Sequence, residues 1–268
     1  MKTTKIAKVF ANCRREGRAA LMPFVTAGYP SIEEFVPLVE SLSAGGADMI
    51  EVGFPHSDPL ADGPVIQHAS HLALENGFTV EKGFAAIQAA TMRIAQPIVV
   101  MCYANVVLRR GVEKFVKQCE ASGVSGLIVP DMILEESASV RAACRKHGID
   151  FVPLVTLTTP AARANEIATA GTGFVYFVSV TGTTGARSEL NLELKTEVMR
   201  MRRQTELPVA VGFGISTPDM AAEVGTYCSG VIVGSKILLL IAESGTDKKY
   251  SPVAHFLTEA RMKLEAQR

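Results

Sequence analysis

The sequence lacks several features that would each assign it to a particular class of protein. Its 27 lysines and arginines equal its 27 aspartates and glutamates, and it has neither a basic stripe nor a basic–aromatic helix. We therefore expect no nucleic-acid partner and no membrane-surface partner. The longest apolar run near the C-terminus, residues 237–242, is far too short to cross a bilayer.

Cysteine pairs and a signal-peptide core are also missing. The five cysteines are widely spaced and form no CxxC pair, a pattern typical of reduced thiols rather than of a disulfide framework. The N-terminus is basic but lacks an apolar core, so we expect a cytoplasmic protein, with an organellar transit peptide as the alternative. Ile6, Val9 and Phe10 are spaced as on one face of an amphipathic first helix.

What the chain does contain is a repeated alternation of short apolar runs and stretches of helical period. Such strands between helices are typical of a parallel sheet covered by helices. Eight units in 268 residues predict an α/β fold, a single (β/α)8 TIM barrel domain over residues 1–268 with an extra N-terminal helix. A doubly wound sheet is the alternative, but no GxGxxG follows the first strand. The expected strands are residues 21–27, 49–54, 98–103, 126–130, 151–157, 174–180, 209–213 and 231–234.

Two helix starts carry local signals. Glu34 follows Ser31 at the spacing of a capping box, which predicts a helix over residues 31–44. Pro218 follows Thr217 and is well suited to the first helical position of residues 218–224. The other helices expected from periodicity are residues 112–122, 134–147, 161–170 and 189–204.

The stretch EVGFPHSDPLADGP, residues 51–64, places two acids around a rigid turn. Glu51 lies inside an apolar strand, where an unpaired carboxylate is costly, and the first six expected strands contain no Lys or Arg to pair with it. Prolines and a glycine stiffen the loop that carries Asp62. Two acids in different environments can divide acid and base work between them. A structural role for Glu51 and a turn-stabilising role for Asp62 are the alternatives.

Other chemistry-bearing residues follow the later strands. In this fold the C-terminal strand ends form the active site, and Tyr103, Asn105, Asp131 and Tyr176 lie at or near such ends. Glycine-rich segments at residues 182–185, 212–216 and 234–235 predict a phosphate site, because glycine lets backbone N–H groups approach oxygens. The Gly- and Thr-rich residues 181–188 are expected to form a lid over the site.

A metal site and a reactive lysine are the remaining alternatives. His68, His71 and Glu75 share one face of a helix, which could bind a metal but is ordinarily a solvated face, and we expect no metal. Lys236 could form a Schiff base, but a lysine that opens the next helix is the ordinary interpretation.

Taken together, these motifs resemble the α subunit of tryptophan synthase over almost the whole chain. The SDPLADGP string is highly specific, and all the motifs occur in the order of that family. The motifs are PFVTAGYP (residues 23–30), EVGFPHSDPLADGP (51–64), MCYANVV (101–107), SVTGTTG (179–185), GFGIS (212–216) and VGS (233–235).

The resemblance implies a lyase of the tryptophan biosynthesis pathway. It implies retro-aldol cleavage of indole-3-glycerol phosphate to indole and glyceraldehyde 3-phosphate, with no cofactor in this chain. It also implies a β subunit that carries pyridoxal phosphate, receives indole through a channel for L-tryptophan synthesis, and forms an α2β2 heterotetramer. The alternatives are a free-standing indole-3-glycerol-phosphate lyase, a non-catalytic barrel, and another phosphate-sugar isomerase or aldolase.

Roles for individual residues follow from the same resemblance. Glu51 would be the acid–base residue, and Asp62 would contact the indole N–H. Thr184, in the lid, would position Asp62, and Asn105 would face the β subunit. The indole pocket would be lined by Tyr176, Phe24, Ile66, Met101, Ile128 and Phe213. The phosphate would be held by Gly185, Gly214, Gly234 and Ser235.

Two places depart from the family pattern. His56 stands where an aromatic ring is expected, which bears on the packing of the loop. After Asp131 the chain reads MILEE, residues 132–136, where prolines are common, and this departure bears on the contacts expected with a β subunit.

Overall fold

Short parallel strands form the centre of the computed structural model, which describes residues 3–178, 187–212, 214–245, 247 and 249–266. The strands are β1 (Ala20–Thr26), β2 (Ile50–Gly53), β3 (Ile98–Met101), β4 (Val124–Ile128), β5 (Asp150–Phe151), β6 (Leu154–Thr156), β7 (Val175–Val178), β8 (Val209–Gly212) and β9 (Gly230–Val233). Within the described residues their order in the sheet is β5-β4-β3-β2-β1-β9-β8-β7-β6. The prediction of a parallel (β/α)8 barrel is confirmed.

The barrel closes at the fifth predicted strand, which is split into β5 and β6. These outer strands of the sheet are joined through only Val152 and Pro153. The Val152 N–H donates to Leu127 O of β4 (2.9 Å), and the Tyr176 N–H of β7 donates to Pro153 O (2.9 Å). Val152 and Pro153 therefore connect the sheet to β4 on one side and to β7 on the other. Residues 151–157 are predicted as one strand, and Pro153, which has no N–H to donate, lies where that strand is broken.

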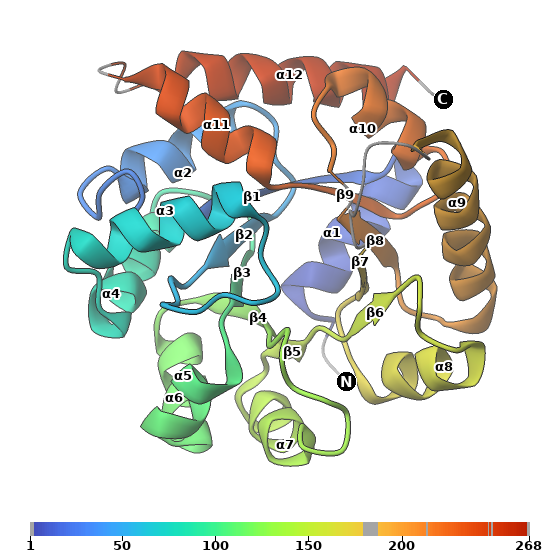
Figure 1. Ribbon diagram of the computed structural model, residues 1–268, viewed down its shortest axis with the longest axis horizontal. Coiled ribbons are helices and arrows are strands. Elements are labelled where there is room, and N and C mark those ends of the chain that lie inside the picture. The colour runs from blue at the N-terminus through green and yellow to red at the C-terminus, as the bar shows by residue number, and fades with distance from the viewer. Residues whose placement is uncertain (1–2, 179–186, 213, 246, 248, 267–268) are drawn as a thin grey trace.

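Helices surround the strands in a ring (Figure 1). They cover the outer face of the sheet, where alternate strand residues such as Ile50 and Val52 pack in one core with Leu38 and Phe84. The helices are α1 (Lys5–Arg15), α2 (Phe35–Ala44), α3 (Pro64–Glu75), α4 (Val80–Thr91), α5 (Ala104–Arg110), α6 (Val112–Ala121), α7 (Ala138–His147), α8 (Ala161–Ala170), α9 (Arg187–Gln204), α10 (Pro218–Gly225), α11 (Ser235–Ser244) and α12 (Ser251–Glu265).

The extra N-terminal helix α1 packs against the barrel interior. Its residues Ile6 and Phe10 belong to a second core with Met22 and Ile232, and the rings of Phe10 and Phe174 lie 5.5 Å apart. Thr4 caps the helix by accepting a hydrogen bond from the Ala7 N–H (3.2 Å). The predicted amphipathic first helix is confirmed, and it buries apolar side chains at one end of the barrel.

Of the two predicted helix starts, one is confirmed and one is wrong. Thr217 accepts a hydrogen bond from the Met220 N–H (3.2 Å), and Pro218 is the first residue of α10. Ser31 does not begin a helix, because α2 starts at Phe35 with Glu34 as its N-cap and no side-chain cap. The Glu34 carboxylate instead accepts a hydrogen bond from the Tyr250 hydroxyl (2.9 Å), a tertiary contact that a capping-box pattern cannot anticipate.

The other predicted helices are found, α8 with the predicted ends and α6, α7 and α9 with shifted ends. Helix α7 begins four residues later than expected, because residues 134–137 form turns closed by the Ser137 hydroxyl, which donates to Leu134 O (2.6 Å). Helix α9 begins at Arg187, so the segment expected as a lid ends before its predicted boundary, and its residues up to 186 lie outside the described part. No helix among the described residues is both long and apolar enough to span a bilayer.

Candidate active site

Glu51 points into the barrel from the second strand. Its neighbours in sequence, Ile50 and Val52, pack outward against the helices, so the alternation of a strand turns Glu51 inward. It lies level with Phe24 of β1 and Val99 of β3, and Val99 belongs to the interior core. Its side chain is buried, with 1% of the residue exposed.

This carboxyl group has an unusual electrostatic environment. Neither oxygen has a hydrogen-bond partner of good geometry within the described part of the chain. Burial raises the pKa of Glu51 to about 8, the charge of Asp62 adds to this, and the nearby Tyr176 hydroxyl lowers it in part. Near neutral pH Glu51 is therefore protonated, and it can donate a proton and take one back.

Asp62 is held by a tight turn that follows β2. The Asp62 N–H donates to Pro59 O (3.0 Å), and the Gln67 side-chain amide donates to Asp62 O (2.8 Å). The Tyr103 hydroxyl donates to Asp62 Oδ2 (3.1 Å). Burial raises the pKa of Asp62 to about 6, while the Tyr103 hydrogen bond and the nearby His56 lower it. Near neutral pH Asp62 is mostly ionised.

The two acids thus occupy different protonation states at the same pH. Each influences the other, since the charge of Asp62 is one cause of the raised pKa of Glu51. A neutral carboxyl beside an ionised one supplies a proton donor and a fixed negative charge in one site.

Tyr176 of β7 reaches the same interior. Its neighbours across the sheet are Leu154 and Ala210. Burial, followed by the charges of Glu51 and Asp62, raises the pKa of the Tyr176 hydroxyl well above its ordinary value, so it remains a neutral donor. The absence of a side chain at Gly212 makes room for it, since a Cβ there would lie 2.6 Å from the Tyr176 ring.

Four of the residues expected to wall the indole pocket lie around this point. The Phe24 ring covers Gly53, where a Cβ would lie 2.6 Å from the ring. Met101 pairs with Ile128 in the sheet, and both contact the interior core. A Cβ at Gly234 would lie 3.7 Å from Phe24 and 3.9 Å from Ile66, so this glycine lies beside the same wall.

The glycines expected to bind phosphate stand at two neighbouring strand ends. Gly234 links β9 to α11 as the helix N-cap, and Ser235 is the exposed first residue of the helix. Gly214 follows β8 with φ of 38°, a conformation that favours glycine. Free N–H groups and the positive end of α11 make this corner suited to an anion. Three further predicted site residues, Phe213, Thr184 and Gly185, lie outside the described residues.

Sequence reasoning placed Tyr103 at a strand end of the active face and noted His56 as a departure from the family pattern, but it gave neither residue a role in the site. Tyr103 stands at the end of β3 and reaches Asp62, 41 residues away. The ring of His56 stacks on that of Tyr103, and its Nε2 hydrogen-bonds with Asn105 Oδ1 (3.1 Å) on exposed α5. A polar aromatic residue at a strand end is the available signal for Tyr103, but nothing in the sequence pairs it with Asp62.

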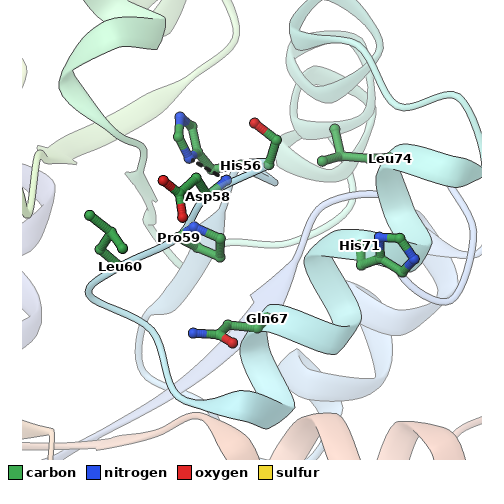
Figure 2. A pocket seen from close by; sticks show the side chains of 8 residues that line it. His56, Asp58, Pro59, Leu60, Gln67, His71 and Leu74 are labelled. Atoms are coloured by element: carbon green, nitrogen blue, oxygen red, sulfur yellow. Dashed lines mark hydrogen bonds between the residues drawn. The ribbon is translucent and has the colours of Figure 1, made fainter.

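A hollow of about 340 Å³ lies beside this loop, and neither acid lines it. Figure 2 shows the side chains around it. His71, from α3, lines it, and its exposed Nε2 lies 3.2 Å from Glu75 Oε1. Among the described residues no group of three His, Cys, Asp or Glu side chains could hold a metal ion. The hollow is lined by His56, Ser57, Asp58, Pro59, Leu60, Gln67, His71 and Leu74.

Comparison with known proteins finds one family. The family model described as "Tryptophan synthase alpha chain" matches residues 10–267. The tryptophan synthase alpha chain of Methanosarcina mazei is 45% identical over 248 residues, which cover 92% of this chain and 90% of that protein. The alpha chain of Gloeobacter violaceus is 41% identical over 258 residues, covering 96% and 94%.

Solved structures agree with these sequences. A structure of Mycobacterium tuberculosis tryptophan synthase superposes with a TM-score of 0.90 at 36% identity, covering 98% of this chain and 99% of that one. The tryptophan synthase alpha chain of Legionella pneumophila superposes with a TM-score of 0.88 at 32% identity, covering 98% and 97%.

Proposed function

The chain belongs to the tryptophan synthase alpha chain family, and we propose that Glu51 and Asp62 carry out its cleavage of indole-3-glycerol phosphate to indole and glyceraldehyde 3-phosphate. The observation that carries this assignment is the buried carboxyl of Glu51, which has a raised pKa and lies in the interior close enough to Asp62 to feel its charge. A retro-aldol cleavage at indole C3 needs one group that gives and takes a proton, and one that stabilises a positive charge.

The first step uses both acids. Neutral Glu51 donates its proton to C3 of the indole ring, which leaves a positive charge centred on the ring nitrogen. Ionised Asp62 lies beside the N–H and stabilises that charge, and such preorganised charge is worth most in a site shielded from water. The raised pKa of Glu51 keeps the required proton available near neutral pH.

The second step breaks the carbon–carbon bond and restores Glu51. The Glu51 carboxylate accepts the proton of the adjacent glycerol hydroxyl, whose oxygen then forms the aldehyde carbonyl. The bonding electrons return to the ring and neutralise the nitrogen. One proton has moved from the hydroxyl to C3, and the enzyme ends in its starting state.

The remaining site residues hold the two ends of the substrate. Around the ring we place Tyr176, Phe24, Ile66, Met101, Ile128 and Phe213. Around the phosphate we place Gly185, Gly214, Gly234 and Ser235, where the N-terminus of α11 favours an anion. Thr184 would position Asp62. Binding energy from the phosphate, which does not react, can position the reacting carbon.

A β subunit that carries pyridoxal phosphate is the proposed receiver of indole, in an α2β2 heterotetramer in the cytoplasm. Three large apolar side chains support a docking face: Leu60 after β2, Leu108 in α5 and Ile133 after β4 are 85%, 57% and 56% exposed. They follow three adjacent strands of the barrel, and grouped exposed apolar side chains mark protein interfaces. Asn105 lies on the same face. We further propose that residues 1–268 act as one domain.

Indole release from indole-3-glycerol phosphate tests this function. The purified chain is assayed alone and with a tryptophan synthase β subunit. We expect slow release by the chain alone and a large rise with the partner. Fast release without a partner would favour the free-standing lyase, and no release by the folded chain in either assay would refute the proposal.

A further inference from the structure

The position of Asp62 depends on Tyr103. The Tyr103 hydroxyl donates to Asp62 Oδ2 (3.1 Å) and accepts a hydrogen bond from the Ala61 N–H (3.0 Å). One hydroxyl therefore joins the Asp62 loop at a side chain and at the backbone, from a residue on the neighbouring strand. Tyr103 is buried, so its ring has few alternative positions.

The ring of His56 packs on Tyr103 from the same loop that carries Asp62. The two ring centroids lie 4.5 Å apart with 26° between the planes, a stacked arrangement. A phenyl ring could make this contact equally well. What distinguishes His56 is that both of its ring nitrogens are also engaged.

The hydrogen bonds of His56 define its tautomer. The Asp58 N–H donates to Nδ1 (3.1 Å), so Nδ1 carries no proton, and Nε2–H donates to Asn105 Oδ1 (3.1 Å). The first bond ties the ring to its own loop, as the dashed line in Figure 2 shows. The second ties it to α5, the helix that begins next to Tyr103. The imidazole therefore cannot turn or slide without losing a hydrogen bond.

We propose that His56 is a positioning residue that holds Tyr103, and through Tyr103 the carboxylate of Asp62, in place for cleavage. The inference rests on the proposed role of Asp62. Because the hydrogen bonds of His56 among the described residues go to Asp58 and Asn105 and to neither acid, it contributes orientation and no proton transfer. Small misplacements of a catalytic group slow the chemical step strongly. Loss of the two His56 hydrogen bonds should therefore lower kcat and leave KM nearly unchanged.

The test compares His56→Phe, Tyr103→Phe and the double variant in the isolated chain, so that altered partner binding cannot contribute. His56→Phe keeps the stacked ring and removes both hydrogen bonds. We expect kcat for indole-3-glycerol phosphate to fall about 10-fold, with KM within about twofold. Tyr103→Phe should lower kcat at least as much. The kcat of the double variant should agree with that of Tyr103→Phe within about twofold, because both changes break the same chain of contacts from His56 to Asp62.

Two further variants serve as controls. His71→Phe makes the same substitution on α3, at the hollow beside the loop, and should leave kcat unchanged. Asn105→Ala removes only the hydrogen bond to His56 Nε2. Because Asn105 is exposed, the fold should tolerate this change, and kcat should fall about threefold. Thermal midpoints of all variants are measured alongside.

Three outcomes overturn the inference. The first is a wild-type kcat in His56→Phe. The second is a fall in kcat of the double variant that equals the product of the two single falls. The third is a rise in the KM of His56→Phe at constant kcat. Asp62→Asn is assayed in parallel. If that variant retains wild-type kcat, the proposed role of Asp62 fails with the inference, whereas an inactive Asp62→Asn beside a fully active His56→Phe refutes the inference alone.

Discussion

Replacing Glu51 with glutamine should stabilise the fold while stopping the reaction. The carboxyl is buried without a good hydrogen-bond partner in the described part of the chain, and its pKa is raised from 4.5 to about 8. Below about pH 4.5 the carboxyl is neutral in both the folded and the unfolded chain. As pH rises from there to about 8, the unfolded chain loses this proton and the folded chain keeps it, so the wild type loses stability over that window.

The size of the effect follows from the two pKa values. A carboxyl with a pKa of 4.5 in the unfolded chain and about 8 in the fold costs about 5 kcal/mol above pH 8. Glutamine escapes this cost but leaves a buried amide to satisfy, so we expect a net gain of about 2 to 3 kcal/mol. For a chain of this length that gain corresponds to a rise in thermal midpoint of about 5 to 10 °C.

The assay measures thermal midpoint and indole release for wild type and Glu51→Gln from about pH 4.5 to 8. At the acid end the midpoint of the variant should lie below that of the wild type, because only the buried amide then costs stability, and it should rise above the wild-type midpoint as pH increases. The cleavage rate of the variant should be lower by about 100-fold or more. Glu243→Gln, an exposed change on α11, is the matched control and should alter neither quantity.

Two results would refute this reasoning. A difference between the two midpoints that stays constant across the pH range would mean that Glu51 is not held neutral in the fold. Near-normal turnover by Glu51→Gln would remove Glu51 from the mechanism, whatever the midpoints.

Three other changes probe the site and its scaffold. The cleavage rate should fall as pH drops through about 6, because Asp62 must be ionised. In Asp62→Asn this fall at acid pH should disappear, and kcat should be lower by about 100-fold or more. An unchanged fall at acid pH in the variant would exclude Asp62 as its cause. Gly212→Ala places a methyl group 2.6 Å from the Tyr176 ring, so kcat/KM should fall about 10-fold and the midpoint should drop; unchanged kinetics would show that the ring can move freely. Arg18→Ala removes the bidentate partner (2.7 and 2.8 Å) of the mostly buried Asp48 and leaves its ion pair with Arg261 (2.9 Å) in place. The free energy of unfolding in urea should therefore fall by about 2 kcal/mol, whereas no measurable loss would contradict this.

Glu51 combines two demands that oppose each other. The proposed mechanism needs a carboxyl that stays neutral near physiological pH, which requires burial without a counterion. Stability would be better served by an apolar residue at the same place in β2. The expected loss of stability with rising pH is therefore a direct consequence of the proton donor that the proposed mechanism needs.

The sequence by itself determined the architecture. The spacing of apolar residues along a strand or a helix reflects which of its faces is buried. Because this spacing can be read within one short segment, the order of strands and helices could be predicted from the sequence alone. The same holds for Thr217 and Pro218 at the start of α10, and for α1, whose apolar face appears in the spacing of Ile6 and Phe10. Glu51 could be singled out because a charge inside an apolar strand is conspicuous.

Only the tertiary structure decided how the site is assembled. Pairing of β2 with β3 brings Tyr103 to Asp62, and pairing of β7 with β8 sets the ring of Tyr176 against Gly212; no local pattern encodes either contact. The pKa of Glu51 depends on burial from all sides and on the charge of Asp62, a loop residue. Ser31 failed as a helix cap for the same reason, since Glu34 bonds to Tyr250 from the far end of the chain. Secondary structure follows from neighbours in sequence, whereas orientation, protonation and hydrogen-bond partners follow from neighbours in space.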